Sequence, residues 1–133
     1  MVFVDASAMI SLITGEADAD DIADRLEAGR PGLWSGISGW ETIAGLCRSY
    51  MFSVQSARDV VQDFIRANDL ETVSIGEREF DLAVQAYAEF GRGRHPAALN
   101  LGDCFAYACT KTNRAKLLFK GDDFGKTDIA QAD

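Results

Sequence analysis

Short apolar runs alternate with longer segments of helical periodicity along the chain. The runs contain β-branched and aromatic residues, which favour buried strands, and they lie at Val2–Val4, Leu33–Trp34, Thr72–Ile75 and Lys116–Phe119. In the segments between them, apolar residues recur at intervals of three and four, which is the spacing of one helix face. This spacing predicts helices over residues 5–14, 18–28, 38–52, 54–67, 77–90 and 101–112.

This alternation of strands and helices predicts the fold class. Strands separated by helical crossovers pair in parallel, and the crossover helices cover the sheet. We therefore expect an α/β fold, a three-layer α/β/α sandwich with a mostly parallel central sheet. The length of 133 residues fits one domain, so residues 1–133 are predicted to form a single unit.

The composition is typical of a soluble globular protein. Hydrophobic residues make up 47% and charged residues 26% of the chain, values that argue against disorder. The three cysteines form no C-x-x-C pair, which favours small buried residues in a reducing compartment over a disulfide framework. The N-terminal apolar run is too short for a signal peptide, and no segment approaches the ~20 apolar residues of a membrane helix. We therefore expect a cytoplasmic protein without membrane contact.

Five acidic residues, two of them adjacent, differ from the other acids in their local setting. Asp5 ends the first apolar strand, and Asp122 and Asp123 follow the last one. Glu41 and Asp103 lie near the starts of two predicted helices. Groups at the carboxyl ends of strands in an open α/β sheet converge on one crevice. We therefore expect these acids to lie together, whereas the remaining acids belong to solvated helix faces.

Each of these acids also has a purely structural explanation. The pattern Ser38-x-x-Glu41 is that of a capping box, and Asn100-x-x-Asp103 has a similar form. Asp5 is suited to cap the helix that follows it, and residues 121–125 have the composition of a turn. The grouping of the acids, rather than any one of them, favours a functional site.

Several carboxylates in one crevice repel one another, and a hard divalent cation relieves that repulsion. Mg²⁺ binds oxygen ligands, often one or two carboxylates together with waters. Such sites activate water and stabilise phosphoryl oxygens during phosphodiester cleavage, with one metal ion or two. The chain has one histidine, His95, and no cysteine cluster, which disfavours zinc.

Four segments resemble the signature segments of a known family. They are VDASA, SGWETIAGL, GRGRHPAALNLGDCFAYA and LLFKGDDFGKTDI. They are similar to those of PIN-domain ribonucleases, and most similar to the VapC toxin branch of type II toxin–antitoxin systems, from residue 2 to about residue 129. The resemblance implies an α/β/α sandwich with Mg²⁺- or Mn²⁺-dependent endoribonuclease activity on an RNA substrate. It also implies a homodimer that is held inactive by a cognate VapB-type antitoxin.

The resemblance assigns roles to the acidic residues. Asp5, Glu41 and Asp103 match the first, second and third acids of the family. Asp123 is the favoured fourth acid, with Asp122 a close second. Asp5 and Asp103 are expected to bind the metal directly, whereas Glu41 and the fourth acid orient waters or hold a second ion.

Two further residues match family positions with supporting roles. Ser7 corresponds to a small hydroxyl residue two positions after the first acid, and Asn100 precedes the third acid in the family pattern. The apolar residues expected either to dock the antitoxin or to pack in the core are Trp34, Trp40, Met51 and Phe52.

The net charge of −8 by itself argues against a nucleic-acid partner. The charge is nevertheless uneven, because residues 92–126 hold seven basic side chains and only three acids. Those three acids are Asp103, Asp122 and Asp123. The basic residues, which either flank the acids or scatter over different faces, are Arg92, Arg94, Lys111, Arg114, Lys116, Lys120 and Lys126. Among them, Arg92, Arg94 and Lys120 are the predicted RNA contacts.

Two other functions remain open at this point. A phosphatase or phosphotransferase of the same fold class would use a strand-end Asp as its nucleophile, commonly with a second Asp two residues later. Ser7 occupies that position here, which counts against this function. A non-catalytic module would use the acidic crevice to bind a partner.

Overall fold

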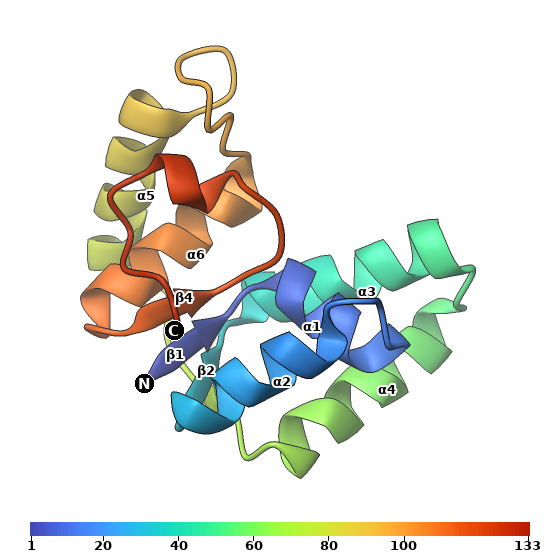
Figure 1. Ribbon diagram of the computed structural model, residues 1–133. Helices are drawn as coiled ribbons and strands as arrows, with labels where there is room; N and C mark the ends of the chain where they lie inside the picture. The colour runs from blue at the N-terminus through green and yellow to red at the C-terminus, as the bar shows by residue number, and fades with distance from the viewer.

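The centre of the molecule is a four-stranded parallel sheet, seen in the computed structural model of residues 1–133 (Figure 1). The strands follow the order β3-β2-β1-β4, and every neighbouring pair is parallel. They are β1 (Val2–Val4), β2 (Gly32–Trp34), β3 (Glu71–Thr72) and β4 (Lys116–Leu118). The predicted parallel sheet is confirmed, and β1 lies inside it between β2 and β4.

Six helices cover the two faces of this sheet and complete the predicted three-layer sandwich (Figure 1). They are α1 (Ala6–Thr14), α2 (Ala19–Ala28), α3 (Gly36–Tyr50), α4 (Val54–Ala67), α5 (Glu77–Phe90) and α6 (Leu101–Thr112). A short 3₁₀ helix, η1 (Phe124–Lys126), follows β4. Because neighbouring residues of a strand point to opposite faces, Phe3 packs with α5 and α6, whereas Val2 and Val4 pack with α1–α4.

Several element boundaries differ from the predictions by one to three residues, among them the start of α3 and the end of β3. Helix α3 begins at Gly36 rather than Ser38, because Ser35 is its N-cap and accepts a hydrogen bond from the Ser38 amide. The capping box is therefore Ser35 with Ser38, and the predicted box of Ser38 with Glu41 is wrong. Strand β3 ends at Thr72 instead of Ile75. Its only neighbour is β2, and the last hydrogen bond between them runs from the Val73 amide to the Trp34 carbonyl, because the chain after Trp34 turns into α3 at its N-cap Ser35.

The predicted burial of the cysteines is confirmed for two of the three. All three are free, with Cys104 and Cys109 buried and Cys47 partly buried. Burial raises the pKa of Cys104 to about 11 and that of Cys109 to about 12, so both thiols stay protonated at neutral pH. None of the helices combines the length and the apolar character needed to cross a bilayer.

Leu118 tests how strongly the sheet depends on its edge strand β4. Its side chain is completely buried against the helices of the α1–α4 face. Leu118→Ala should lower the free energy of unfolding by about 2–5 kcal/mol, through lost burial and the cavity it leaves. Urea denaturation of the parent and variant measures the difference. Val54→Ala, at a side chain that is 69% exposed, is the control and should change stability by less than about 0.5 kcal/mol.

Candidate functional site

Asp5 lies where β1 passes into α1, at the carboxyl edge of the sheet. Its backbone N–H donates to the carbonyl of Leu118 at 3.0 Å, and its carboxylate caps α1. Ser7 donates to the same carboxylate oxygen, Oδ2, from its amide at 3.3 Å and from its hydroxyl at 2.7 Å. The Ser7 hydroxyl in turn accepts a hydrogen bond from the Lys120 amide at 3.0 Å. The segment after β4 therefore fixes the orientation of the buried Asp5 carboxylate.

Asp103 lies in the first turn of α6 and is held by the predicted capping box. The backbone N–H of Asn100 donates to Asp103 Oδ2 at 3.0 Å, and the backbone N–H of Asp103 donates to the side-chain oxygen Oδ1 of Asn100 at 2.9 Å. Only one carboxylate oxygen of Asp103 takes part in this pair. The structural role of Asn100 and Asp103 thus leaves Asp103 Oδ1 without a protein hydrogen bond.

Glu41 projects from α3 to the start of α6. Its carboxylate packs directly against Gly102, in the space where a side chain at position 102 would begin. Glu41 also lines an open groove of about 550 Å³ between the first turns of α3 and α6, together with Ile37, Trp40 and Leu101. Trp40 and Leu101 are about two-thirds exposed, at 70% and 68%, so the acid lies beside an apolar surface.

Burial raises the pKa values of all three carboxyl groups, and the charge of Asp5 adds to the shifts of Glu41 and Asp103. Burial raises the pKa of Glu41 to about 7, and the charges of Asp5 and Asp103 add to the shift. Burial also raises the pKa of Asp103 to about 6, opposed by the hydrogen bond from the Asn100 amide. The pKa of Asp5 is raised by burial in the same way. No lysine or arginine forms an ion pair with any of the three.

The two acids after β4 differ in their relation to this group. Both lie in the exposed turn before η1. The charge of Asp123 raises the pKa of Asp103, whereas Asp122 has no such effect on any of the three carboxylates. Asp123 is therefore the better placed candidate for a fourth acid.

The donor set suits a hard cation. The four acids offer only oxygen atoms, and the neighbouring Cys104 keeps its proton. As the side chains stand, no three His, Cys, Asp or Glu residues lie close enough together to ligate one ion. A cation held by one or two carboxylates, with the others reached through water, fits this arrangement and is common for Mg²⁺.

The basic residues of positions 92–126 scatter over several faces. Lys120 Nζ lies 2.7 Å from Glu16 Oε1 and 3.6 Å from Asp18 Oδ1, so two acids already neutralise it. The guanidinium of Arg94 stacks over the Tyr87 ring at 5.0 Å. Arg92 is the one predicted RNA contact that acts on the acids, because its charge lowers the pKa of Asp103.

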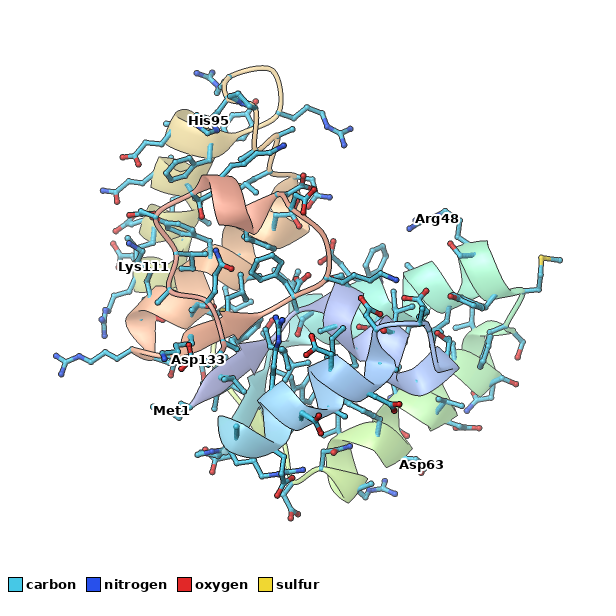
Figure 2. All side chains as sticks on the ribbon, viewed as in Figure 1. Met1, Arg48, Asp63, His95, Lys111 and Asp133 are labelled. Atoms are coloured by element: carbon cyan, nitrogen blue, oxygen red, sulfur yellow. The ribbon has the colours of Figure 1, made fainter.

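Three of the other basic residues lie away from the acids, whereas the Lys126 amide donates to the Asp123 carbonyl at 3.3 Å. Lys111 pairs with Asp128, and Lys126 lies in η1. Arg114 and Lys116 line a cavity at the amino edge of the sheet, where the labelled Met1 and Asp133 also lie (Figure 2).

His95 takes no part in the acidic group. It lies in the loop after α5 (Figure 2), where its Nδ1 accepts a hydrogen bond from the Ala97 amide at 3.0 Å. Its ring packs edge-on against Phe90, with the ring centroids 5.1 Å apart. The histidine therefore organises the loop.

Two residues near the acids were not singled out by the sequence. Arg48 lies on the same helix as Glu41 and lowers the pKa of that carboxyl. Arg48 follows Glu41 by seven residues, or about two helical turns, and this spacing could have placed both side chains on one face of the helix. The sequence marks Gly102 more weakly, only by placing a glycine in the first turn of a helix between two capping residues. Only the packing of α3 against α6 reveals its contact with Glu41.

Comparison with known proteins identifies the family. A model of the PIN domain matches residues 2–130. The chain belongs to the PIN-domain family and, within it, to the VapC ribonucleases. A VapC ribonuclease of Rhizobium meliloti is 34% identical over 97% of this chain and 99% of its own length. Ribonuclease VapC30 of Mycobacterium tuberculosis is 37% identical over 96% of this chain and 95% of its own length.

Solved structures share the fold at lower sequence identity. VapC20 of Mycobacterium tuberculosis, described as a sarcin–ricin loop cleaving toxin, is 20% identical with a TM-score of 0.72, over 99% of this chain and 98% of that one. VapBC-1 of nontypeable Haemophilus influenzae is 16% identical with a TM-score of 0.73, over 100% of this chain and 98% of that one. These two likenesses extend over essentially the whole chain.

The raised pKa of Glu41 predicts how stability depends on pH without metal. Between its unfolded value of 4.5 and about 7, the folded protein binds more protons than the unfolded chain, so Glu41 makes stability fall as pH rises. Glu41→Gln should remove this loss. It should stabilise the protein at pH 8 by on the order of 1 kcal/mol, after allowance for solvent screening of this half-buried group.

Urea unfolding in EDTA at pH 5, 6, 7 and 8 measures this effect. Glu71→Gln, which removes an exposed carboxylate on β3, is the matched control and should follow the profile of the parent. Identical profiles for the parent and Glu41→Gln would show that Glu41 carries no electrostatic strain.

Proposed function

We propose that this protein is a Mg²⁺-dependent endoribonuclease that acts as the toxin of a toxin–antitoxin pair, with Mn²⁺ able to replace Mg²⁺. The observation that carries the proposal is the group of Asp5, Glu41 and Asp103, which are buried or half-buried, have raised pKa values and lack any ion-pair partner. A bound cation would relieve this repulsion. Membership of the VapC ribonucleases supports RNA as the substrate.

In this proposal, Asp5 and Asp103 hold the cation. Ser7 fixes the Asp5 carboxylate, and Asn100 fixes that of Asp103 while leaving one oxygen available. Glu41 and Asp123, or Asp122 in its place, orient waters or hold a second ion. Mg²⁺ bound in such a site acidifies the attacking water and stabilises the phosphoryl oxygens. Arg92 is the favoured contact for the RNA backbone, because its charge already reaches Asp103.

The proposal includes a VapB-type antitoxin and a homodimer in the cytoplasm. Two structural neighbours, from Klebsiella pneumoniae and Haemophilus influenzae, are described as a toxin–antitoxin complex and as VapBC-1. Among the candidate docking residues, Trp34 and Phe52 are partly buried against the core. Trp40 and Met51 are 70% and 89% exposed, so these two support an apolar docking surface for the antitoxin.

A phosphatase-type reaction finds less support. Ser7 stands where the second Asp of such sites is common, and it has no carboxylate to offer. A non-catalytic binding module remains the alternative that needs an experimental test.

Asp103→Asn tests the nuclease proposal. It removes a metal-binding charge but keeps an oxygen that can accept the hydrogen bond from the Asn100 amide. Mg²⁺-dependent cleavage of RNA should fall by on the order of 100-fold or more, with thermal stability equal to or above that of the parent. Cleavage of a labelled RNA and thermal melting measure the two effects. Asp24→Asn, at an exposed acid of α2, is the control and should keep full activity.

Full cleavage by Asp103→Asn would contradict the site assignment. A metal titration of the parent separates the nuclease from the binding module. Mg²⁺ or Mn²⁺ at a hundredfold excess over its dissociation constant should stabilise the folded protein by about 2.7 kcal/mol, and EDTA should reverse the effect. No metal-dependent stabilisation would favour the binding module.

Trp40→Ala tests the proposed antitoxin surface. An exposed aromatic residue in an apolar patch is a common anchor for a protein partner, and its loss costs about 2 kcal/mol or more in such positions. The variant should therefore need roughly 30-fold more antitoxin for inhibition of RNA cleavage. The cognate VapB-type antitoxin is the partner to use. Val84→Ala, at an exposed apolar residue of α5, is the control, and equal inhibition of both variants would contradict this surface.

A further inference from the structure

Gly102 is buried in the first turn of α6, between the two residues of the capping box. A Cβ atom built on its backbone falls closer than 3.0 Å to three carboxyl atoms of Glu41, a separation that Cβ atoms essentially never show. These three carboxyl atoms are the nearest heavy atoms to that Cβ position. The Glu41 carboxylate therefore occupies the volume that any other residue at position 102 would fill.

The backbone conformation of Gly102 does not require glycine. Its φ lies outside the left-handed region, unlike those of Gly15, Gly93 and Gly121. Glycine is also a poor residue for a helix, because it loses more conformational freedom than alanine. Neither the turn nor the helix thus explains the glycine, and the remaining explanation is the space that it leaves for Glu41.

We infer that Gly102 is a positioning residue for Glu41, and that it allows this carboxylate to reach Asp5 and Asp103 across the start of α6. The inference rests on the proposed metal-dependent function of the three acids. A side chain at position 102 would push the end of the Glu41 side chain outward, toward the open groove beside Trp40. Because Glu41 is flexible, the displacement would cost the fold little and would act on the site.

Gly102→Ala provides the test, because it adds only the Cβ atom. Calorimetric titration of the full chain with Mn²⁺, without RNA, measures metal affinity directly. Supporting side chains at metal sites typically change affinity 10–100-fold, so the dissociation constant should rise by about 10-fold or more. The thermal midpoint should stay equal to or above that of the parent, since alanine favours the helix.

Gly36→Ala is the matched control. Gly36 also lies in a helix first turn, at the start of α3, and its added Cβ would meet no atom within 4 Å. Its Mn²⁺ affinity should equal that of the parent. A general effect of alanine in a helix first turn would change both variants, whereas displacement of Glu41 changes only Gly102→Ala.

A double-mutant cycle shows whether Gly102 acts through Glu41. Glu41→Ala removes the carboxylate, so Gly102→Ala should change Mn²⁺ affinity by less than about twofold in that background. An undiminished effect of Gly102→Ala in the absence of Glu41 would overturn the inference, because the alanine would then act by another route. Mn²⁺ binding by Gly102→Ala equal to the parent's would overturn it as well.

These outcomes are distinct from a failure of the proposed function. A parent protein that binds no Mn²⁺ and cleaves no RNA would overturn the metal-dependent function, and the inference with it. A parent that binds and cleaves, together with a Gly102→Ala variant that is folded and equally competent, would overturn the inference alone.

Discussion

Repulsion among Asp5, Glu41 and Asp103 is the unfavourable interaction that the surrounding structure has to offset. Each of these carboxyl groups is buried or half-buried, and none forms an ion pair with a lysine or arginine. The fold holds two of them with hydrogen bonds from the starts of helices. Asp5 caps α1 and Asp103 belongs to the capping box of α6, where the helix dipole favours a negative charge. Helix starts thus bring the acids together and offset part of the cost.

Structural and chemical roles coincide in these residues. Capping is satisfied by one oxygen of Asp103, and the hydrogen bonds to Asp5 converge on Oδ2. The other oxygen of each carboxylate stays available for a ligand. A residue can therefore be essential to a helix start and still serve the site, so the two explanations considered for each acid do not exclude one another.

The sequence predicts what depends on local pattern. Apolar periodicity located the parallel sheet and its helices, and strand ends and capping patterns singled out Asp5 and Asp103. The start of α3 was misplaced because Ser35 and Ser38 both suit an N-cap, and only the course of β2 selects Ser35. The contact of Gly102 with Glu41 and the neutralisation of Lys120 by Glu16 join residues distant in sequence. A single sequence carries no local trace of such packing.

The acidic site can be completed only late in folding, because hydrogen bonds join the first acid to the end of the last strand. The Asp5 amide donates a hydrogen bond to the Leu118 carbonyl, and the Ser7 hydroxyl accepts one from the Lys120 amide. These partners are separated by more than a hundred residues, as the separation of 113 between Ser7 and Lys120 shows. During synthesis on the ribosome, Asp5 emerges early and lacks these contacts until the chain is nearly complete. A truncated product that ends before β4 would carry the first three acids without the strand and the following segment that orient the Asp5 carboxylate.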